Sequence, residues 1–278
     1  MQLIHAYRLD GIDLDFELYA LFTQQQASQY TQLIVDLRRA LGKQAFISVE
    51  MPGDHETLHS MDCSAANVCN NNLRMIAKNA YVSLMGYDFH NPAYPPYVTG
   101  NSSNLYTDLH APSPPGFYRI SDDQAIKYLI GLEVPAGKII LGFPAYFHIY
   151  GGVHDQSSSY GLYQPFDPKQ TPVNELGPGT GPYRSIDQLL ASGFTRHYLT
   201  VDHNISAVFA YDSVKHQWIS YEDQVSVAAK THYVVANHLA GMMMWEIGED
   251  MPVANQRSLL RTADMILSKQ ERKRLIAQ

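Results

Sequence analysis

Three acidic residues alternate with apolar ones between Asp10 and Glu17, where the chain reads DGIDLDFE. An alternation with a period of two indicates a β-strand with one acidic and one apolar face. On such a strand Asp13, Asp15 and Glu17 share a face and follow one another at about 6.6 Å. Because like charges repel at that distance, we expect at least one of these carboxyl groups to hold a proton near neutral pH. A protonated carboxyl group is what general acid catalysis requires.

Two other interpretations of this acidic stretch remain open. An edge strand with a solvent-exposed acidic face would show the same alternation, and so would a strand whose acids bind magnesium. A calcium-binding EF-hand is excluded, because that pattern needs glycine at its sixth position and Leu18 stands there when counting starts at Asp13.

Further candidate residues stand at the ends of other predicted strands. Tyr87 and Asp88 end one strand, and a polar pair at the carboxyl end of a parallel strand is typical of functional positions in barrel enzymes. Met85, in the same strand, fits a core position. Trp245 ends the last strand beside polar residues, which favours an aromatic platform for a ligand. Tyr146 follows a fourth strand, where it would either contact a ligand or pack in the core.

The elements that must position these residues alternate between strands and helices. The patterns predict strands over residues 10–17, 45–51, 81–87, 139–143 and 241–247. They predict helices over residues 23–41, 73–80, 122–132, 222–239 and 255–275. Residues 53–70 are expected to be irregular and residues 88–118 to form a loop. This alternation implies parallel β/α units.

Residues 147–216 differ in character from the rest of the chain. They are rich in Gly, Ser, Tyr and Pro and contain short strand-like pieces. We interpret them as a small α+β insertion domain of roughly 70 residues, within the usual size range of a domain. The insertion would divide the main domain into a first segment, residues 1–146, and a last segment, residues 217–278.

Composition limits the class of protein. The chain has 278 residues, 45% of them hydrophobic, which suits one large domain or a domain with an insertion. A net charge of −7 argues against binding nucleic acid. No stretch approaches the ~18 apolar residues of a membrane span, and the first ten residues contain no signal peptide. Cys63 and Cys69 cannot complete a zinc site by themselves, and whether they pair in a disulfide stays open.

The acidic stretch resembles the DGxDxDxE signature of glycoside hydrolase family 18, which contains the chitinases and their relatives. The residues MGYDFH around Tyr87 are similar to the family's MxYDxxG stretch, although Asn91 replaces the glycine. The residues LGFPAY that end at Tyr146 resemble a GxPxYG strand, although Phe147 replaces the last glycine. Similar segments also lie at residues 99–106 and 241–250. The segments follow the order of the family.

The resemblance implies a (β/α)8 TIM barrel with a chitinase insertion domain, and an endo- or exo-acting chitinase that uses the substrate's own N-acetyl group as nucleophile. It implies the catalytic residues Glu17, Asp15, Asp13 and Tyr87. It implies the substrate-binding residues Asp88, Trp245, Met85 and Tyr146. Chitin or a chitooligosaccharide is the implied partner, without nucleic acid, membrane, cofactor or metal, and the implied location is extracellular. The oligomeric state is not predicted.

Three alternatives accompany this interpretation: a non-catalytic chitin-binding protein, an inactive relic of a chitinase, and a relative that cleaves peptidoglycan or N-glycans. In the family the acidic motif ends the fourth barrel strand, whereas here it begins at residue 10. We therefore expect an incomplete barrel of about strands 4 to 8. Its acidic strand would be an open edge, and the chain alone would be unstable and weakly active.

Overall fold

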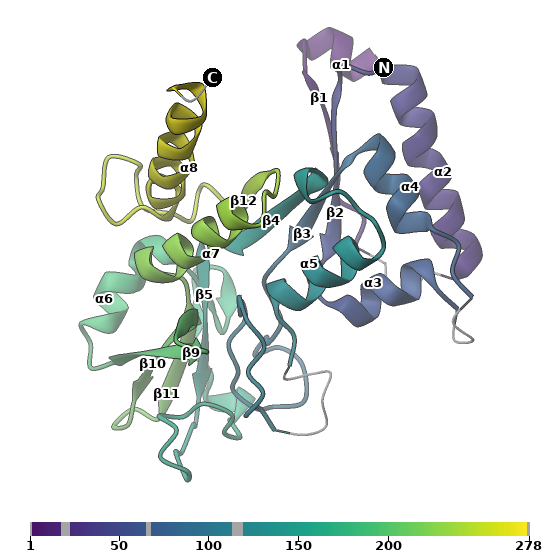
Figure 1. Cartoon of the computed structure of the whole chain (residues 1–278). Helices are drawn as coiled ribbons and strands as arrows, with labels where there is room; N and C mark the ends of the chain where they lie inside the picture. The colour runs from purple at the N-terminus through teal and green to yellow at the C-terminus, as the bar shows by residue number, and fades with distance from the viewer. Residues whose placement is uncertain (1, 18–22, 65–67, 113–118, 277–278) are drawn as a thin grey trace.

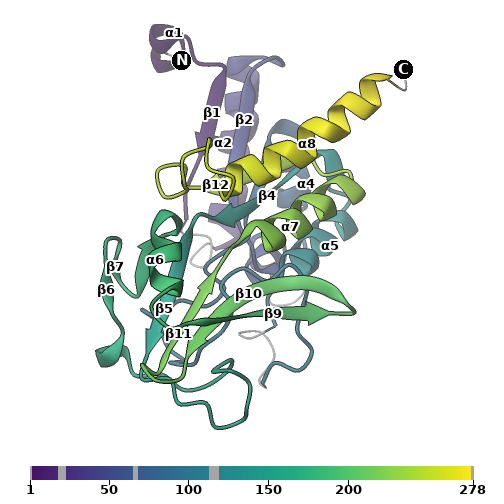
Figure 2. The ribbon, with the colours of Figure 1, turned by 90° about the vertical axis from the view of Figure 1, so that its left-hand side faces the viewer.

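Two sheets and their covering helices make up the computed structural model, which describes residues 2–17, 23–64, 68–112 and 119–276. One sheet is parallel and the other antiparallel, and in both views the antiparallel sheet lies below the parallel one (Figures 1 and 2). The two ends of the described chain, at α1 and α8, both lie near the top of Figure 1. Residues 65–67 of the predicted irregular stretch and residues 113–118 of the predicted loop fall outside the described residues, as do residues 18–22.

The parallel sheet contains all five strands that the alternation of the sequence predicts. Its order is β1 (Gly11–Leu14), β2 (Phe46–Pro52), β3 (Tyr81–Met85), β4 (Ile139–Pro144) and β12 (Gly241–Trp245). Every neighbouring pair is parallel. The sheet curls into half a barrel, so the carboxyl ends of its strands meet along one rim. Among the described strands β1 and β12 are its edges, as expected for the acidic strand.

The helices that accompany this sheet are α1 (Gln2–Tyr7), α2 (Gln24–Leu41), α3 (His55–Asp62), α4 (Asn72–Asn79), α5 (Asp122–Gly131), α7 (Gln224–Ala236) and α8 (Leu259–Ile276). Helices α2 to α5 and α7 lie between strands in the sequence, whereas α1 precedes β1 and α8 follows β12; α2 to α5 lie along one side of the sheet (Figure 1). Local capping fixes where several begin: Thr23 and Gln26 form a capping box on α2, and the Ser121 hydroxyl accepts from the backbone N–H of Gln124 on α5. In the described part of the chain, no helix is both long and apolar enough to cross a membrane.

The two faces of the parallel sheet carry different side chains. The outer face packs against the helices and is apolar, with a core that includes Ile47, Val49, Val82, Leu84 and Leu141 of the strands and Ile34, Leu58, Ile76, Ile126 and Leu129 of the helices. The inner face carries small and polar residues at the alternate positions, and the register places Asp13 opposite Ser48 and Glu50 opposite Ser83. Because successive side chains of a strand lie on opposite faces of the sheet, the polar residues lie on the inner face and the apolar core residues on the outer face.

The antiparallel sheet is built from the segment between β4 and α7. Its order is β8 (Thr180–Pro182), β5 (Tyr146–Gly151), β11 (Gln217–Tyr221), β10 (Asn204–Asp212) and β9 (Thr195–Val201). A small ribbon of β6 (Val173–Asn174) and β7 (Gly177–Pro178) and the short helix α6 (Ile186–Leu190) complete the segment. The sheet thus begins at Tyr146 and ends at Tyr221. Its core joins the barrel through Phe143, Val227 and Leu259.

Three local differences from the sequence predictions have physical causes. β1 ends at Leu14, so Asp15 and Glu17 follow the strand, because its pairing with β2 stops at Leu14 and its other side has no described neighbour. The last strand likewise ends at Trp245 instead of residue 247, where its pairing with β4 stops. Residues 55–62, predicted to be irregular, form α3, whose N-cap is Asp54.

Cys63 and Cys69 form a disulfide in the segment after α3. The Asp62 carboxylate beside it accepts from the backbone N–H of Leu73, near the start of α4. The pairing that the sequence left open is therefore present, and it closes the connection between α3 and α4.

Candidate active site

A pocket of about 310 Å³ lies at the carboxyl ends of the parallel strands, between this sheet and the antiparallel one. Its lining includes Asp15, Glu17, Glu50, Met85, Tyr87, Asp88, Asn91, Tyr146, His148, Thr180, Trp245 and Glu249. Seven of the eight residues that the sequence nominates line it, and the eighth, Asp13, lies on β1 just beneath Asp15. Residues far apart in the sequence therefore converge at the rim where barrel enzymes carry their active sites.

The acidic stretch approaches the pocket from β1. Asp13 accepts a short hydrogen bond from the Ser48 hydroxyl of β2, its partner in the strand register. Partial burial raises the pKa of Asp15, and the charge of Asp13 raises it further. Burial also raises the pKa of Glu17, and the charges of Asp15 and Asp88 add to this effect. A carboxyl group whose pKa is raised keeps its proton closer to neutral pH, which suits Glu17 to deliver it.

Tyr87 follows β3 and places its ring in the pocket. Its hydroxyl lies 3.9 Å from the sulfur of Met243 on β12. Burial raises the pKa of Tyr87, and the nearby carboxylates of Glu50, Asp88, Asp15 and Glu17 raise it further. The phenol therefore stays neutral and can donate a hydrogen bond to a ligand.

Asp88 is held by the antiparallel sheet. The same carboxylate oxygen accepts from the Tyr146 hydroxyl at 2.9 Å and from His148 Nε2 at 2.7 Å, both on β5. His148 Nδ1 in turn lies 3.2 Å from the hydroxyl of Thr180 on β8. Burial alone would raise the pKa of Asp88, but the hydrogen bond and charge of His148, and the hydrogen bond from Tyr146, lower it. The second sheet thus fixes an ionised carboxylate on the pocket wall.

Trp245 forms an aromatic wall of the pocket from the end of β12. Its side chain is 47% exposed, unlike the fully buried Trp218 of the antiparallel sheet. An indole with one free face can stack on the apolar face of a planar or ring-shaped ligand. Met85, which we interpreted as a core residue from the sequence, also reaches the pocket.

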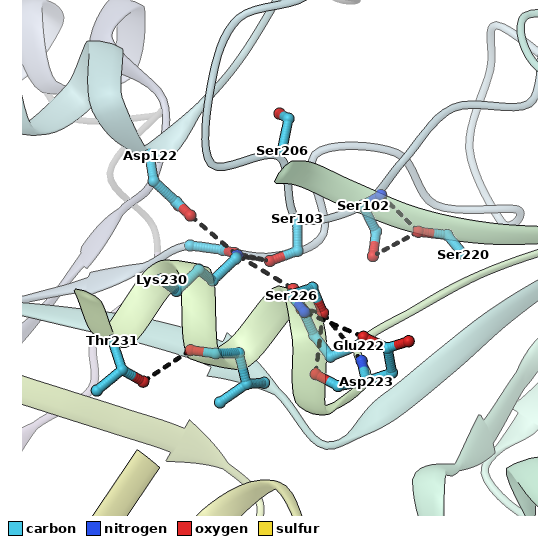
Figure 3. Close-up of polar contacts among 12 residues, drawn as sticks. Ser102, Ser103, Asp122, Ser206, Ser220, Glu222, Asp223, Ser226, Lys230 and Thr231 are labelled. Carbon is cyan, nitrogen blue, oxygen red and sulfur yellow. Dashed lines mark hydrogen bonds and ion pairs between the residues drawn. The ribbon is translucent and has the colours of Figure 1, made fainter. Parts of the chain in front are cut away.

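A buried ion cluster forms around Lys230 (Figure 3). Lys230 of α7 is fully buried, and its ammonium group lies 2.9 Å from Asp122 and 3.1 Å from Glu222. Burial alone would lower the pKa of Lys230, but the two facing carboxylates raise it. Lys230 also donates to the Ser103 hydroxyl, which donates to the carbonyl of Gly86, the residue before Tyr87. The cluster therefore supports the backbone that carries the site.

The loop that contains Ser103 is also anchored to the antiparallel sheet. Ser102 donates its backbone N–H to the Ser220 hydroxyl at 2.9 Å (Figure 3). The Ser206 hydroxyl donates to the carbonyl of Tyr106 at 2.7 Å. The residues 99–106 that resemble a family segment thus join the two sheets from a largely buried position.

Sequence reasoning missed several pocket residues, above all Glu50 and His148. The sequence indicates Glu50 in one respect: it is a single acid in a strand that is otherwise mostly apolar, and its side chain lies on the same face of that strand as Ser48. Lys230 had a similar signal, as a lone cation within an apolar helix. His148 had none, because only the fold brings β5 against Asp88.

The geometry bears on the magnesium alternative. A protein magnesium site needs oxygen ligands close together around the ion. Among the described residues, the only group of three or more His, Cys, Asp and Glu with ligand atoms within 4.8 Å of one another is Asp62, Cys63 and Cys69, and both cysteines there are in the disulfide. The acidic stretch does not form such a group.

Residues 1–250 match the family described as Glycosyl hydrolases family 18. The chain belongs to this family. Its relatives include Chitinase 1 of Aphanocladium album, 26% identical over 267 residues that cover 94% of this chain and 56% of that protein. The class V chitinase of Arabidopsis thaliana is 26% identical over 90% of this chain and 61% of its own length. Human chitinase-3-like protein 2 is 24% identical over 89% of this chain and 60% of its own length. The chain spans about three-fifths of the length of these relatives.

Solved structures of family 18 members share the fold. The chitinase ChiA74 from Bacillus thuringiensis superimposes with a TM-score of 0.78 at 23% identity, over 96% of this chain and 45% of its own. A family 18 N-acetylglucosaminidase from Paenibacillus barengoltzii superimposes with a TM-score of 0.74 at 26% identity, over 95% of this chain and 73% of its own. The class V chitinase from Nicotiana tobaccum, in complex with NAG4, superimposes with a TM-score of 0.73 at 21% identity, over 95% of this chain and 70% of its own. The fold is therefore TIM-barrel-like, with the five parallel strands as a curled half-barrel.

Proposed function

We propose that this family 18 protein is a chitinase, which hydrolyses β-1,4 bonds between N-acetylglucosamine units with retention of configuration. The observation that carries the proposal is the convergence of Glu17, Asp15, Tyr87 and Trp245 on one pocket. The family is an exception to the usual pair of carboxylates in glycoside hydrolysis, since the substrate's own acetamido group supplies the nucleophile. The reaction therefore does not need a second carboxylate of the protein to act as the nucleophile.

Each pocket residue has a role in this reaction. Glu17 protonates the glycosidic oxygen while the acetamido carbonyl oxygen attacks C1 and closes an oxazolinium ring. Asp15 accepts a hydrogen bond from the acetamido N–H and stabilises the positive charge, and Asp13 shares a proton with Asp15. Tyr87 donates its hydroxyl to the acetamido oxygen and orients it. Water then opens the ring, with the Glu17 carboxylate as base.

The remaining residues bind the sugar. Trp245 stacks beneath the ring, and Asp88, fixed by Tyr146 and His148, accepts from sugar hydroxyls in the distorted ring. Met85 packs against the same pocket. We propose that residues 147–216, as a chitinase insertion domain, form the second wall of the groove. We also propose an extracellular protein, and the disulfide between Cys63 and Cys69 supports an oxidising compartment.

Chromogenic chitobiose and chitotriose substrates test this proposal directly. We expect release of the chromophore, at a rate that EDTA does not change, because no step uses a metal. Release that stops with EDTA and returns with Mg²⁺ would instead support the magnesium alternative. Binding of chitooligosaccharides without cleavage would support the non-catalytic alternative, a state that the human relative YKL-39, described as a pseudo-chitinase with retained chitooligosaccharide binding, represents.

Tyr87→Phe and Asp15→Asn are each expected to lower kcat strongly on N-acetylated substrates. Removing one preorganised hydrogen bond to developing charge costs about 2.7–4 kcal/mol, or 10²–10³-fold in rate. KM should change much less, since both bonds strengthen in the transition state. The measurement is steady-state kinetics with chitotriose, beside the conservative control Tyr94→Phe at an exposed tyrosine. Cleavage of a deacetylated trimer as fast as chitotriose would contradict these roles.

Trp245→Ala is expected to weaken binding more than chemistry. The exposed indole face contributes stacking and apolar contact, so its loss should raise the Kd for a chitotetraose by about tenfold, which corresponds to ~1.4 kcal/mol. Calorimetric titration of a hydrolysis-deficient background measures this change. An unchanged Kd would remove Trp245 from the binding site.

A further inference from the structure

Glu50 is a pocket carboxyl group that none of the roles above uses. It lies in the middle of β2, on the inner face of the parallel sheet, and is only 7% exposed. The register places it opposite Ser83 of β3 and two residues after Ser48, which faces Asp13. It lines the same pocket as Asp15 and Glu17. The site thus contains a fourth acid, from a different strand than the acidic stretch.

The side chains around Glu50 decide which form of its carboxyl group is favoured. It is hydrogen-bonded to Asp13 and to the Ser83 hydroxyl. The titratable groups that face it include Asp13 and Asp15 from the β1 segment and Tyr87 from the segment after β3. All three are acids, and the charges of Asp13 and Asp15 disfavour the ionised form of Glu50. Two carboxyl groups in contact at a buried position hold one proton between them.

Burial raises the pKa of Glu50 to about 8, with the charges of Asp13 and Asp15 adding to this effect and the Ser83 hydrogen bond opposing it. At neutral pH Glu50 is therefore a neutral acid, and its O–H can donate to Asp13. Asp13 then accepts from two donors, Ser48 and Glu50. Glu50 is therefore a further proton-holding carboxyl group beside the Asp13, Asp15 and Glu17 series.

We propose that Glu50 is a positioning residue of the reaction, which as a neutral acid donates to Asp13, holds Asp13 and Asp15 in place, and switches the site off when it ionises. Ionisation removes the donor from Asp13 and adds a negative charge beside two others. Asp15 is then displaced, and it no longer accepts the hydrogen bond from the acetamido N–H. This inference rests on the proposed function for its catalytic part, whereas the protonation of Glu50 can be measured without any substrate.

The stability test uses Glu50→Gln, which keeps the shape and an N–H donor but cannot ionise. The folded protein holds the Glu50 proton up to about pH 8, whereas an unfolded chain releases it near pH 4.5. Stability of the wild type therefore falls as pH rises through this window, by comparison with Glu50→Gln. We expect the Tm advantage of Glu50→Gln to grow by several degrees between pH 5 and about pH 9. The matched control, Glu56→Gln at an exposed position on α3, should follow the wild type. A Tm difference for Glu50→Gln that does not change with pH would overturn the proposal.

The activity test follows kcat with pH. Glu50→Gln should retain kcat near pH 6 within a few fold and move the alkaline limb upwards by about one pH unit or more. Ser83→Ala removes a bond that favours the ionised form of Glu50, so it should move the limb in the same direction. This second variant keeps the test decisive if Glu50→Gln does not fold. An alkaline limb of the kcat profile that neither variant moves would refute the positioning role. Absence of hydrolysis at every pH would refute the proposed function. The Tm comparison would then still decide whether Glu50 holds a proton.

Discussion

Glu17→Gln is expected to abolish hydrolysis and leave sugar binding nearly intact. Glutamine has the shape of the acid but cannot protonate the leaving oxygen, and a positioned general acid contributes about 10²–10⁴-fold to the rate. The site around it should keep its geometry, because Glu17 follows β1 and no strand pairing depends on its side chain. The loss should therefore appear in kcat, whereas the Kd for chitotetraose stays within about threefold, less than ~0.7 kcal/mol.

Single-turnover hydrolysis and calorimetric titration with the same oligosaccharide separate these two quantities. The matched control is again Glu56→Gln, the same substitution at an exposed glutamate away from the pocket. Activity of Glu17→Gln within about tenfold of the wild type, a barrier change of only ~1.4 kcal/mol, would show that another group delivers the proton.

Lys230→Met is expected to destabilise the fold by about 3–5 kcal/mol. The substitution keeps the volume of the side chain but leaves Asp122 and Glu222 buried without their cation, and removing one partner of a buried ion pair has this cost. For a chain of this size the Tm should fall by roughly 10 °C. The activity of the remaining folded protein should also fall, since the Ser103 contact with Gly86 loses its support.

Thermal unfolding followed by circular dichroism measures the change, with Lys127→Met as the control. Lys127 pairs with Asp123 on the surface of α5, where its side chain is 73% exposed, and the loss there should be below about 0.5 kcal/mol. Adding Asp122→Asn and Glu222→Gln to Lys230→Met removes the stranded charges and should recover part of the Tm. Equal Tm values for Lys230→Met and Lys127→Met would contradict the importance of the cluster.

Much of the half-barrel could be predicted because its signals are local. Each parallel strand shows a period of two or an apolar run, and the helices α2 and α5 begin at the capping residues Thr23 and Ser121 that the sequence displays. The ends of strands were less predictable. β1 stops at Leu14 although the alternation continues to Glu17, because pairing with a neighbour, and not periodicity, decides where a strand ends.

The candidate site divides in the same way. Glu17, Tyr87 and Trp245 could be nominated because they lie in continuous motifs at strand ends. Glu50 stood out in the sequence as a single acid in a mostly apolar strand, but its contacts depend on strand neighbours, and those of His148 depend on a second sheet that approaches only in three dimensions. The buried charge of Lys230 likewise becomes intelligible only when Asp122 and Glu222, from two other segments, are seen around it.

The stereochemistry of cleavage tests the account most directly. The purified protein would be mixed with the tetramer of N-acetylglucosamine, and the anomeric protons of the first product would be followed by NMR before mutarotation. Attack by the substrate's own acetamido group predicts that the β-anomer appears first, and that the fully deacetylated tetramer is not cleaved. Initial formation of the α-anomer, or cleavage of the deacetylated tetramer at a similar rate, would contradict substrate-assisted hydrolysis at the pocket of Glu17, Asp15 and Tyr87.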